Sequence, residues 1–227
     1  MVRKSRLVTG TFAGVLVGFV LLGTLPSATA QTGKENPQQT IKREKDRWAV
    51  KTAIDPGASE IDTRAIKVTV EELLAMQRPA DMSDGKGDPK YQNLRAKPVE
   101  TTVYVVEAKI VECRHMPDGD YRVKIEGKSG KTMYVEMPNP DPEFVSSVSR
   151  FQKDMVKVRK KATDKLKPEA IVKPVSIYAK LTGVGFFGWS KNMQGQPVGN
   201  GIQLHPVLKV DWMKEPKNND RSNAGKP

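Results

Sequence analysis

The sequence predicts a β-rich α+β fold, a five-stranded OB-like barrel in the order β-β-β-α-β-β, with an N-terminal strand/helix extension and disordered termini. Two turn signals separate three runs of alternating apolar residues, which is typical of an antiparallel meander. One segment with helical spacing follows, and two further alternating runs come after it. Five strands are too few for a sandwich but suit a small barrel that a helix plugs.

The chain begins with the features of a secretory leader. Three basic residues precede an uncharged run at 7–23, and small residues follow at 28–30; the basic residues are Arg3, Lys4 and Arg6. We therefore expect residues 1–30 to be a cleaved signal peptide, which makes the protein exported, either periplasmic or extracellular. No integral membrane span is expected after cleavage.

The mature chain divides into four predicted parts. Residues 31–46 are polar and almost free of apolar side chains, and so is 214–227, so both are expected to be disordered as a linker and a tail. The N-terminal extension covers 47–97, and the barrel domain covers 98–213.

Within the extension, a short strand at 66–70 leads into a helix at 70–76. Thr69 is suited to cap this helix, since its side-chain oxygen can accept from a free backbone N–H. Glu71 and Glu72 lie in the first turn, where the helix dipole favours negative charge.

The meander begins with a β-branched strand at 101–113, whose alternation changes phase midway, as a strongly bent strand requires. A turn at 117–120 leads into the second strand at 121–126. A second turn at 129–130 leads into the third strand at 133–137.

The helix that follows is predicted from six apolar residues at intervals of three and four, namely Phe144, Val148, Phe151, Met155, Val158 and Ala162. Alternation returns at 175–181 and at 202–212. A glycine-rich loop at 183–189 joins these last strands, and its glycines would let the backbone pass close to neighbouring aromatic rings.

Charge and cysteine content limit the partners and cofactors. Loss of the leader lowers the formal net charge from +12 to +9, which favours a polyanionic partner, although excess charge also serves solubility. Cys113 is the single cysteine, so no disulfide forms within the chain. One cysteine and two histidines leave too few soft ligands for a structural zinc site, and no cofactor is expected.

The favoured function is a non-catalytic binding module for a polyanion such as nucleic acid, because OB barrels combine a positive groove with stacking aromatics. Trp189 is the most accessible of three loop aromatics, with Phe186 and Phe187 expected to be buried. The predicted ligand-binding residues are Arg122, Lys153, Lys157, Lys160, Lys161, Trp189 and Lys191. A solvated helix exterior would explain the lysines equally well.

Two alternatives remain open. A divalent-metal-dependent phosphodiesterase would use acidic residues, a histidine and Arg122 around an ion and a phosphate; its candidate catalytic residues are Asp118, Asp120, Glu136 and His205. A hairpin turn at Asp118 and a structural role for His205 explain the same residues without an ion. The other alternative is an envelope protein-protein interaction module that acts through the tails or the basic helix.

Several motifs occur in the same order as in a known family, among them Asp118-Gly119-Asp120-Tyr121, Thr182-Gly183-Val184-Gly185-Phe186-Phe187 and Asn200-Gly201-Ile202-Gln203-Leu204-His205-Pro206-Val207-Leu208. Over about residues 47–212 the chain resembles a family of exported bacterial proteins of unassigned function. The resemblance implies a small β-barrel domain and no established activity. The family pattern commonly has histidine at the position of Arg122, His-Gly-Gln at 191–193 and glutamate at the position of Gln203.

Overall fold

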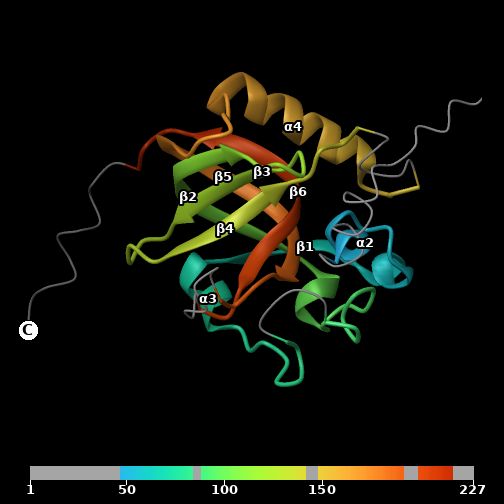
Figure 1. Ribbon diagram of the computed structural model, residues 1–227. Helices are drawn as coiled ribbons and strands as arrows, with labels where there is room; N and C mark the ends of the chain where they lie inside the picture. The colour runs from blue at the N-terminus through green and yellow to red at the C-terminus, as the bar shows by residue number, and fades with distance from the viewer. Residues whose placement is uncertain (1–46, 84–87, 142–147, 192–198, 217–227) are drawn as a thin grey trace, which may run out of the picture. The chain divides into compact units, whose positions relative to one another are not determined.

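The computed structural model describes residues 47–83, 88–141, 148–191 and 199–216, which all belong to the unit Glu35–Pro227 (Figure 1). The predicted leader at 1–30 and linker at 31–46 lie outside the described residues, as does the tail from 217 onward. The elements within the described chain are α2 (Trp48–Lys51), η1 (Pro56–Glu60), β1 (Asp62–Val68), α3 (Val70–Ala75), η2 (Val99–Thr101), β2 (Thr102–His115), β3 (Tyr121–Glu126), β4 (Thr132–Met137), α4 (Gln152–Leu166), β5 (Lys173–Phe187) and β6 (Ile202–Met213).

The strands form one six-stranded sheet in the order β1-β2-β3-β4-β6-β5, so the predicted β-rich fold with few helices is confirmed. An additional pairing between β2 and β5 closes β2-β3-β4-β6-β5 into a ring-like arrangement, with β1 outside it (Figure 1). The meander β2-β3-β4 is antiparallel, as predicted. β1, from the extension, adds to the sheet by pairing parallel with β2.

The predicted bend in the first meander strand is a bulge in β2. The register of β2 shifts between Ile110 and Glu112 against both β3 and β5. A bulge strengthens the local twist of a strand. One long strand therefore turns far enough to pair with two different neighbours, which the ring-like arrangement requires.

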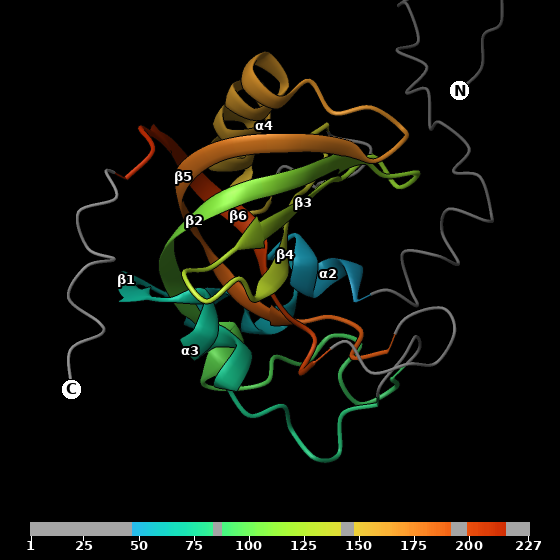
Figure 2. The same ribbon diagram turned by 90° about the vertical axis from the view of Figure 1, so that its left-hand side faces the viewer.

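A helix lies at each end of the ring of strands, with α3 at one end and α4 at the other (Figure 2). α3 has the predicted Thr69 cap as a full capping box, in which Thr69 and Glu72 bond each other's backbone N–H. The predicted limits of the later helix need correction, because α4 begins at Gln152 and runs to Leu166. Val148 precedes it and is 76% exposed, and Phe144 lies outside the described residues.

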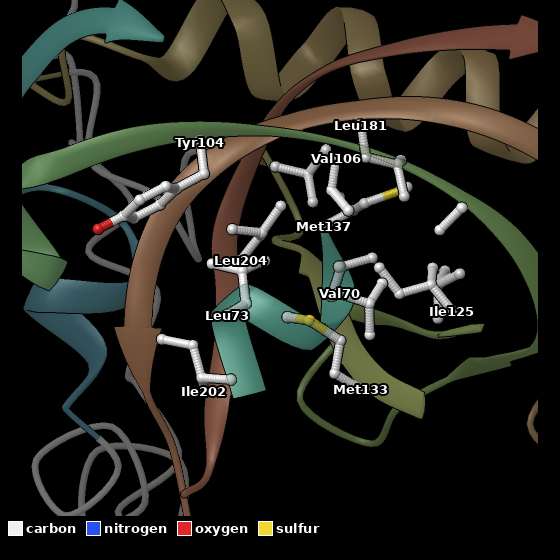
Figure 3. Close-up of a cluster of buried hydrophobic side chains, with 14 of the residues drawn as sticks. Val70, Leu73, Tyr104, Val106, Ile125, Met133, Met137, Leu181, Ile202 and Leu204 are labelled. Atoms are coloured by element: carbon white, nitrogen blue, oxygen red, sulfur yellow. The ribbon is translucent and has the colours of Figure 1, made fainter. Parts of the chain in front are cut away.

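The main hydrophobic core fills the interior of the ring (Figure 3). Val70 and Leu73 of α3 enter this core at one end, beside strand residues such as Leu204. Val158 and Ala162 of α4 join the same core from the other end. Apolar side chains on both helices thus cover the open ends, which bare strands would leave exposed to water.

The predicted glycine loop is mostly strand, because β5 continues through Gly183 and Gly185 to Phe187. A Cβ at Gly185 would lie 2.4 Å from the Val99 carbonyl oxygen, and one at Gly183 would lie 2.9 Å from the Leu204 Cβ. The glycines do permit close approach, as predicted, but they do so within a strand rather than in a loop: Gly183 meets β6 and Gly185 meets η2.

Two buried ion pairs hold the N-terminal extension: Arg47–Glu100 ties it to η2 and β5, and Arg95–Asp55 lies within it. Arg47 binds Glu100 through two N–H···O bonds of 2.7 Å, and Glu100 also accepts from the Phe187 N–H at 2.8 Å. Arg95 binds Asp55 at 2.5 Å. Cys113 is fully buried in β2, as expected for a packed strand residue. Among the described residues, no helix has the length and apolar character needed to cross a membrane.

Candidate functional site

Three of the four candidate catalytic residues come together on three different elements. Asp120 directly precedes β3, Glu136 lies on β4, and His205 lies on β6. Their ligand atoms lie within 4.8 Å of one another, and all three side chains are buried. We call Asp120, Glu136 and His205 the buried triad. It forms because β3 pairs with β4, and β4 pairs with β6, in registers that align these positions.

Asp118, the fourth candidate, belongs to a turn. Its Oδ1 accepts from the Asp120 N–H at 3.3 Å, and Gly119 has a φ of +90°. The Met116 N–H donates to the Asp120 carbonyl at 2.8 Å and closes the loop. The hairpin-turn interpretation is therefore confirmed for Asp118, and this turn is what positions Asp120.

The imidazole of His205 lies between the two carboxyl groups. Its Nδ1 is 3.2 Å from Glu136 Oε2, and its Nε2 is 3.6 Å from Asp120 Oδ2. The 3.2 Å between Nδ1 and Glu136 Oε2 is short enough for a hydrogen bond, but neither contact is aligned as one, so both ring nitrogens and Asp120 Oδ2 are buried without a formed hydrogen bond in the described structure. The edge of Phe186 packs on the ring, with centroids 5.4 Å apart.

The other carboxylate oxygens have firm partners. Glu136 Oε1 accepts from Arg122 Nε at 2.7 Å, and Asp120 Oδ1 accepts from the Asn139 N–H at 3.0 Å. Arg122 stands directly opposite Glu136 in the antiparallel register. Both carboxyl groups are thus held by one oxygen and turn the other toward His205.

Burial dominates the acid–base properties of the triad. It raises the pKa of Asp120 from 3.8 to about 8, helped by the negative charges of Asp118 and Glu136. Burial also lowers the pKa of His205, although Glu136 opposes this shift. For Glu136 burial acts upward, but His205, Arg122 and Lys51 outweigh it and hold its pKa below the ordinary value.

A second group of polar residues lies on the solvent side of β3 and β4, and sequence reasoning found only Arg122 of it. Tyr134 is 38% exposed, with the Arg122 guanidinium 5.4 Å and the Lys124 ammonium 5.6 Å from its ring centroid. Arg114 stands opposite Arg122 on β2. We call Arg122, Lys124 and Tyr134 the β3–β4 face; Arg114 lies beside it on β2. Strand alternation could have found it, since Arg122 and Lys124 share one side of β3.

The predicted lysines of the basic helix lie on the exposed side of α4, as a solvated helix exterior would. They are Lys153, Lys157, Lys160 and Lys161. Lys157 pairs with Asp154 at 3.7 Å and Lys160 pairs with Asp164 at 3.2 Å. Lys161 donates to the Val210 carbonyl at 3.0 Å. Neighbouring carboxylates therefore reduce the local positive charge that the sequence alone indicates.

Trp189 and Lys191 follow β5 at the other end of the ring from α4. The Gly188 carbonyl beside Trp189 accepts from Arg78, which follows α3. Trp189 is 39% exposed while Phe186 and Phe187 are buried, as predicted. Because α3 and α4 occupy opposite ends (Figure 2), the structure does not bring Trp189 and the lysines of α4 into one groove.

No protein-family model matches this chain, and no curated protein matches it. The resemblance inferred from the sequence motifs therefore stays a prediction.

Proposed function

We propose that the protein is an exported binding module for a polyanion, specifically a single-stranded nucleic acid, and that its ring of strands is an OB-like barrel. The order of pairing supports the barrel, since β2-β3-β4-β6-β5 with the helix between β4 and β5 is the strand order expected of an OB fold. OB folds bind their ligands on the second and third barrel strands. These correspond to β3 and β4.

The observation that carries the proposal is the exposed Tyr134 ring on β4, with two cationic side chains of β3, Arg122 and Lys124, close to it. An aromatic ring offers a base a stacking surface worth about 1–3 kcal/mol per base, and nearby cations attract the phosphates. Lys124 and Tyr134 are direct cross-strand partners, so the stacking surface and the charge belong to one site.

The pairing of these cations affects how the face binds. Lys124 contacts Glu112 at 2.7 Å, and Arg122 contacts Glu136 at 2.7 Å. The Lys124 pair is partly exposed, and such pairs contribute at most about 1 kcal/mol, so a phosphate can replace Glu112 at small cost. Arg122 is bound to a buried carboxylate and is better suited to hold its position beside the ring.

The test is fluorescence anisotropy with a labelled single-stranded oligonucleotide over a range of salt concentrations. We expect binding that weakens steeply as salt rises. Tyr134→Ala should weaken it about tenfold or more, and Lys124→Gln should weaken it and flatten the salt dependence.

Lys160→Gln is the matched control for Lys124→Gln, because Lys160 is an exposed lysine on α4 and not on β3 or β4. An equal loss in this control would contradict the assignment to β3 and β4. Inorganic polyphosphate as competitor separates the ligand classes: if Tyr134→Ala weakens polyphosphate binding as strongly as oligonucleotide binding, base stacking is not involved.

A further inference from the structure

The buried triad contains polar atoms whose burial the fold itself does not explain. Asp120 and His205 are fully buried, and Asp120 Oδ2 and both His205 ring nitrogens have no hydrogen bond in the described structure. A buried polar group without a partner costs about 1–3 kcal/mol, and native proteins rarely retain one without a reason such as a bound ion. Of these atoms, Asp120 Oδ2 and His205 Nε2 face each other at 3.6 Å, whereas Nδ1 faces Glu136 Oε2 at 3.2 Å.

The two gaps around the imidazole differ in a way that locates the ion. The 3.2 Å between Nδ1 and Glu136 Oε2 is close to a hydrogen-bond length, whereas the 3.6 Å between Nε2 and Asp120 Oδ2 is too long for one. Two ligands on one tetrahedral zinc ion, with bonds of about 2.0–2.1 Å, stand about 3.4 Å apart. The wider gap is thus close to the space that a single cation spans.

The structure assigns a divalent transition-metal site to Asp120 Oδ2 and His205 Nε2, with Glu136 orienting the imidazole through Nδ1. A histidine ligand commonly donates its second N–H to a carboxylate, which fixes the tautomer and the ring direction. Glu136 is held for this task by Arg122. An imidazole and a carboxylate together suit Zn²⁺ or Mn²⁺, whereas Mg²⁺ and Ca²⁺ prefer sites made of oxygen ligands alone.

This site is separate from polyanion binding, because it needs only the buried triad and not the exposed Tyr134. The two features are neighbours, since Arg122 contacts both Glu136 and the Tyr134 ring. The sequence excluded a structural zinc site because one cysteine and two histidines are too few soft ligands. The site proposed here combines one histidine with the carboxylate of Asp120 instead.

The test measures Zn²⁺ and Mn²⁺ binding by isothermal titration calorimetry on the full chain. Because the triad is buried, the protein is refolded from urea with the cation present as well as titrated in the folded state. We expect one bound cation per chain. Asp120→Asn, which keeps the acceptor for Asn139, should abolish binding, and Glu136→Gln should weaken it about 10–100-fold.

The matched control is His115→Gln, since His115 is the other of the two histidines and lies exposed at the end of β2. It should bind as the wild type does. Unchanged affinity in Asp120→Asn, or lost affinity in His115→Gln, would overturn the site.

A measurement on the unsubstituted protein covers the case in which Asp120→Asn does not fold. Nitrogen-15 NMR of the two histidine rings should show that Zn²⁺ shifts the Nε2 resonance of His205 and leaves Nδ1 protonated. If saturating Zn²⁺ and Mn²⁺ leave the His205 resonances unchanged, in both the titrated and the refolded protein, the proposal is wrong.

Discussion

At the scale of single residues, the strongest contacts connect parts of the chain that are far apart in the sequence. Glu100 is fully buried and accepts hydrogen bonds from Arg47, from the Ala96 N–H and from the Phe187 N–H. One carboxylate thereby joins the start of the extension, η2 and the end of β5. The buried charge of Glu100 is tolerated because both of its carboxylate oxygens accept hydrogen bonds.

Glu100→Gln should therefore destabilise the protein by about 3–5 kcal/mol, since it leaves the guanidinium of Arg47 buried without its counter-charge. Urea unfolding measures the change. The control is Glu107→Gln, which breaks the exposed 3.2 Å pair with Lys67 and should cost at most about 1 kcal/mol. Equal effects of the two substitutions would mean that the buried pair has no special role.

In metal-free buffer that contains a chelator, we expect Asp120 to make the free energy of unfolding depend on pH. Its folded pKa of about 8 lies above the ordinary value of 3.8, so the folded state keeps a proton that the unfolded state has lost. Stability from this group is full below about pH 4 and falls as pH rises toward 8, by up to about 1.4 kcal/mol per pH unit.

Asp120→Asn removes this dependence, so the stability of the variant relative to wild type should increase from pH 4.5 to pH 8. Urea unfolding at several pH values tests this. Parallel stability curves for the two proteins would show that the pKa of Asp120 is not raised. His205 and Glu136 contribute their own pH dependence to both proteins, and the comparison largely removes it.

Among the secondary-structure elements, β5 shows how glycine residues let a strand pack closely against its neighbours. Gly183 and Gly185 allow β5 to approach β6 and the backbone of η2 more closely than any side chain would permit. The register of β5 against β6 also shifts around these two glycines. The strand therefore runs on to Phe187, although its glycine content indicated a loop.

Gly185→Ala should destabilise the protein by about 1–3 kcal/mol, because its Cβ would lie 2.4 Å from the Val99 carbonyl oxygen and neither backbone can easily move. Thermal unfolding followed by circular dichroism gives the measurement. Ser176→Ala, at an exposed position on the same strand, is the control and should be nearly neutral. A fully stable Gly185→Ala protein would contradict this packing of β5.

At the scale of the whole described structure, two helices close the ends of the ring, and the two candidate sites lie on its outer side near Arg122. The buried triad is covered, whereas the β3–β4 face is accessible. Arg122, which a phosphodiesterase would need for its substrate, is already bound to Glu136. This arrangement favours binding over hydrolysis.

We therefore expect a single-stranded oligonucleotide to be bound and to remain intact during prolonged incubation with Mn²⁺ or Zn²⁺. Gel electrophoresis of the recovered oligonucleotide is the measurement. Cleavage that stops on addition of chelator and in Glu136→Gln would instead establish the phosphodiesterase alternative. Cleavage unaffected by both would point to a contaminating nuclease.

Much of the chain's local structure followed from the sequence. Contacts between near neighbours, which turn chemistry and alternation describe, produce the Thr69 cap, the turn at Asp118 and the strands of the meander. The predicted start of α4 was wrong because the helical spacing of apolar residues already begins before Gln152, the first helical residue. The predicted length of β5 was too short because its glycines were taken as loop residues. The sequence does not show that β6 and η2 pack against them.

Most element types, the basic charge and the single cysteine could be read from the sequence, because these are properties of composition and local pattern. Three features became visible only in the folded chain: Asp120, Glu136 and His205 meet, two cations lie near Tyr134, and Trp189 is apart from the lysines of α4. Each of these depends on strand register and on which strands are neighbours. Strand register and the identity of neighbouring strands are set by long-range contacts of the folded chain. A short segment of sequence does not specify either of them.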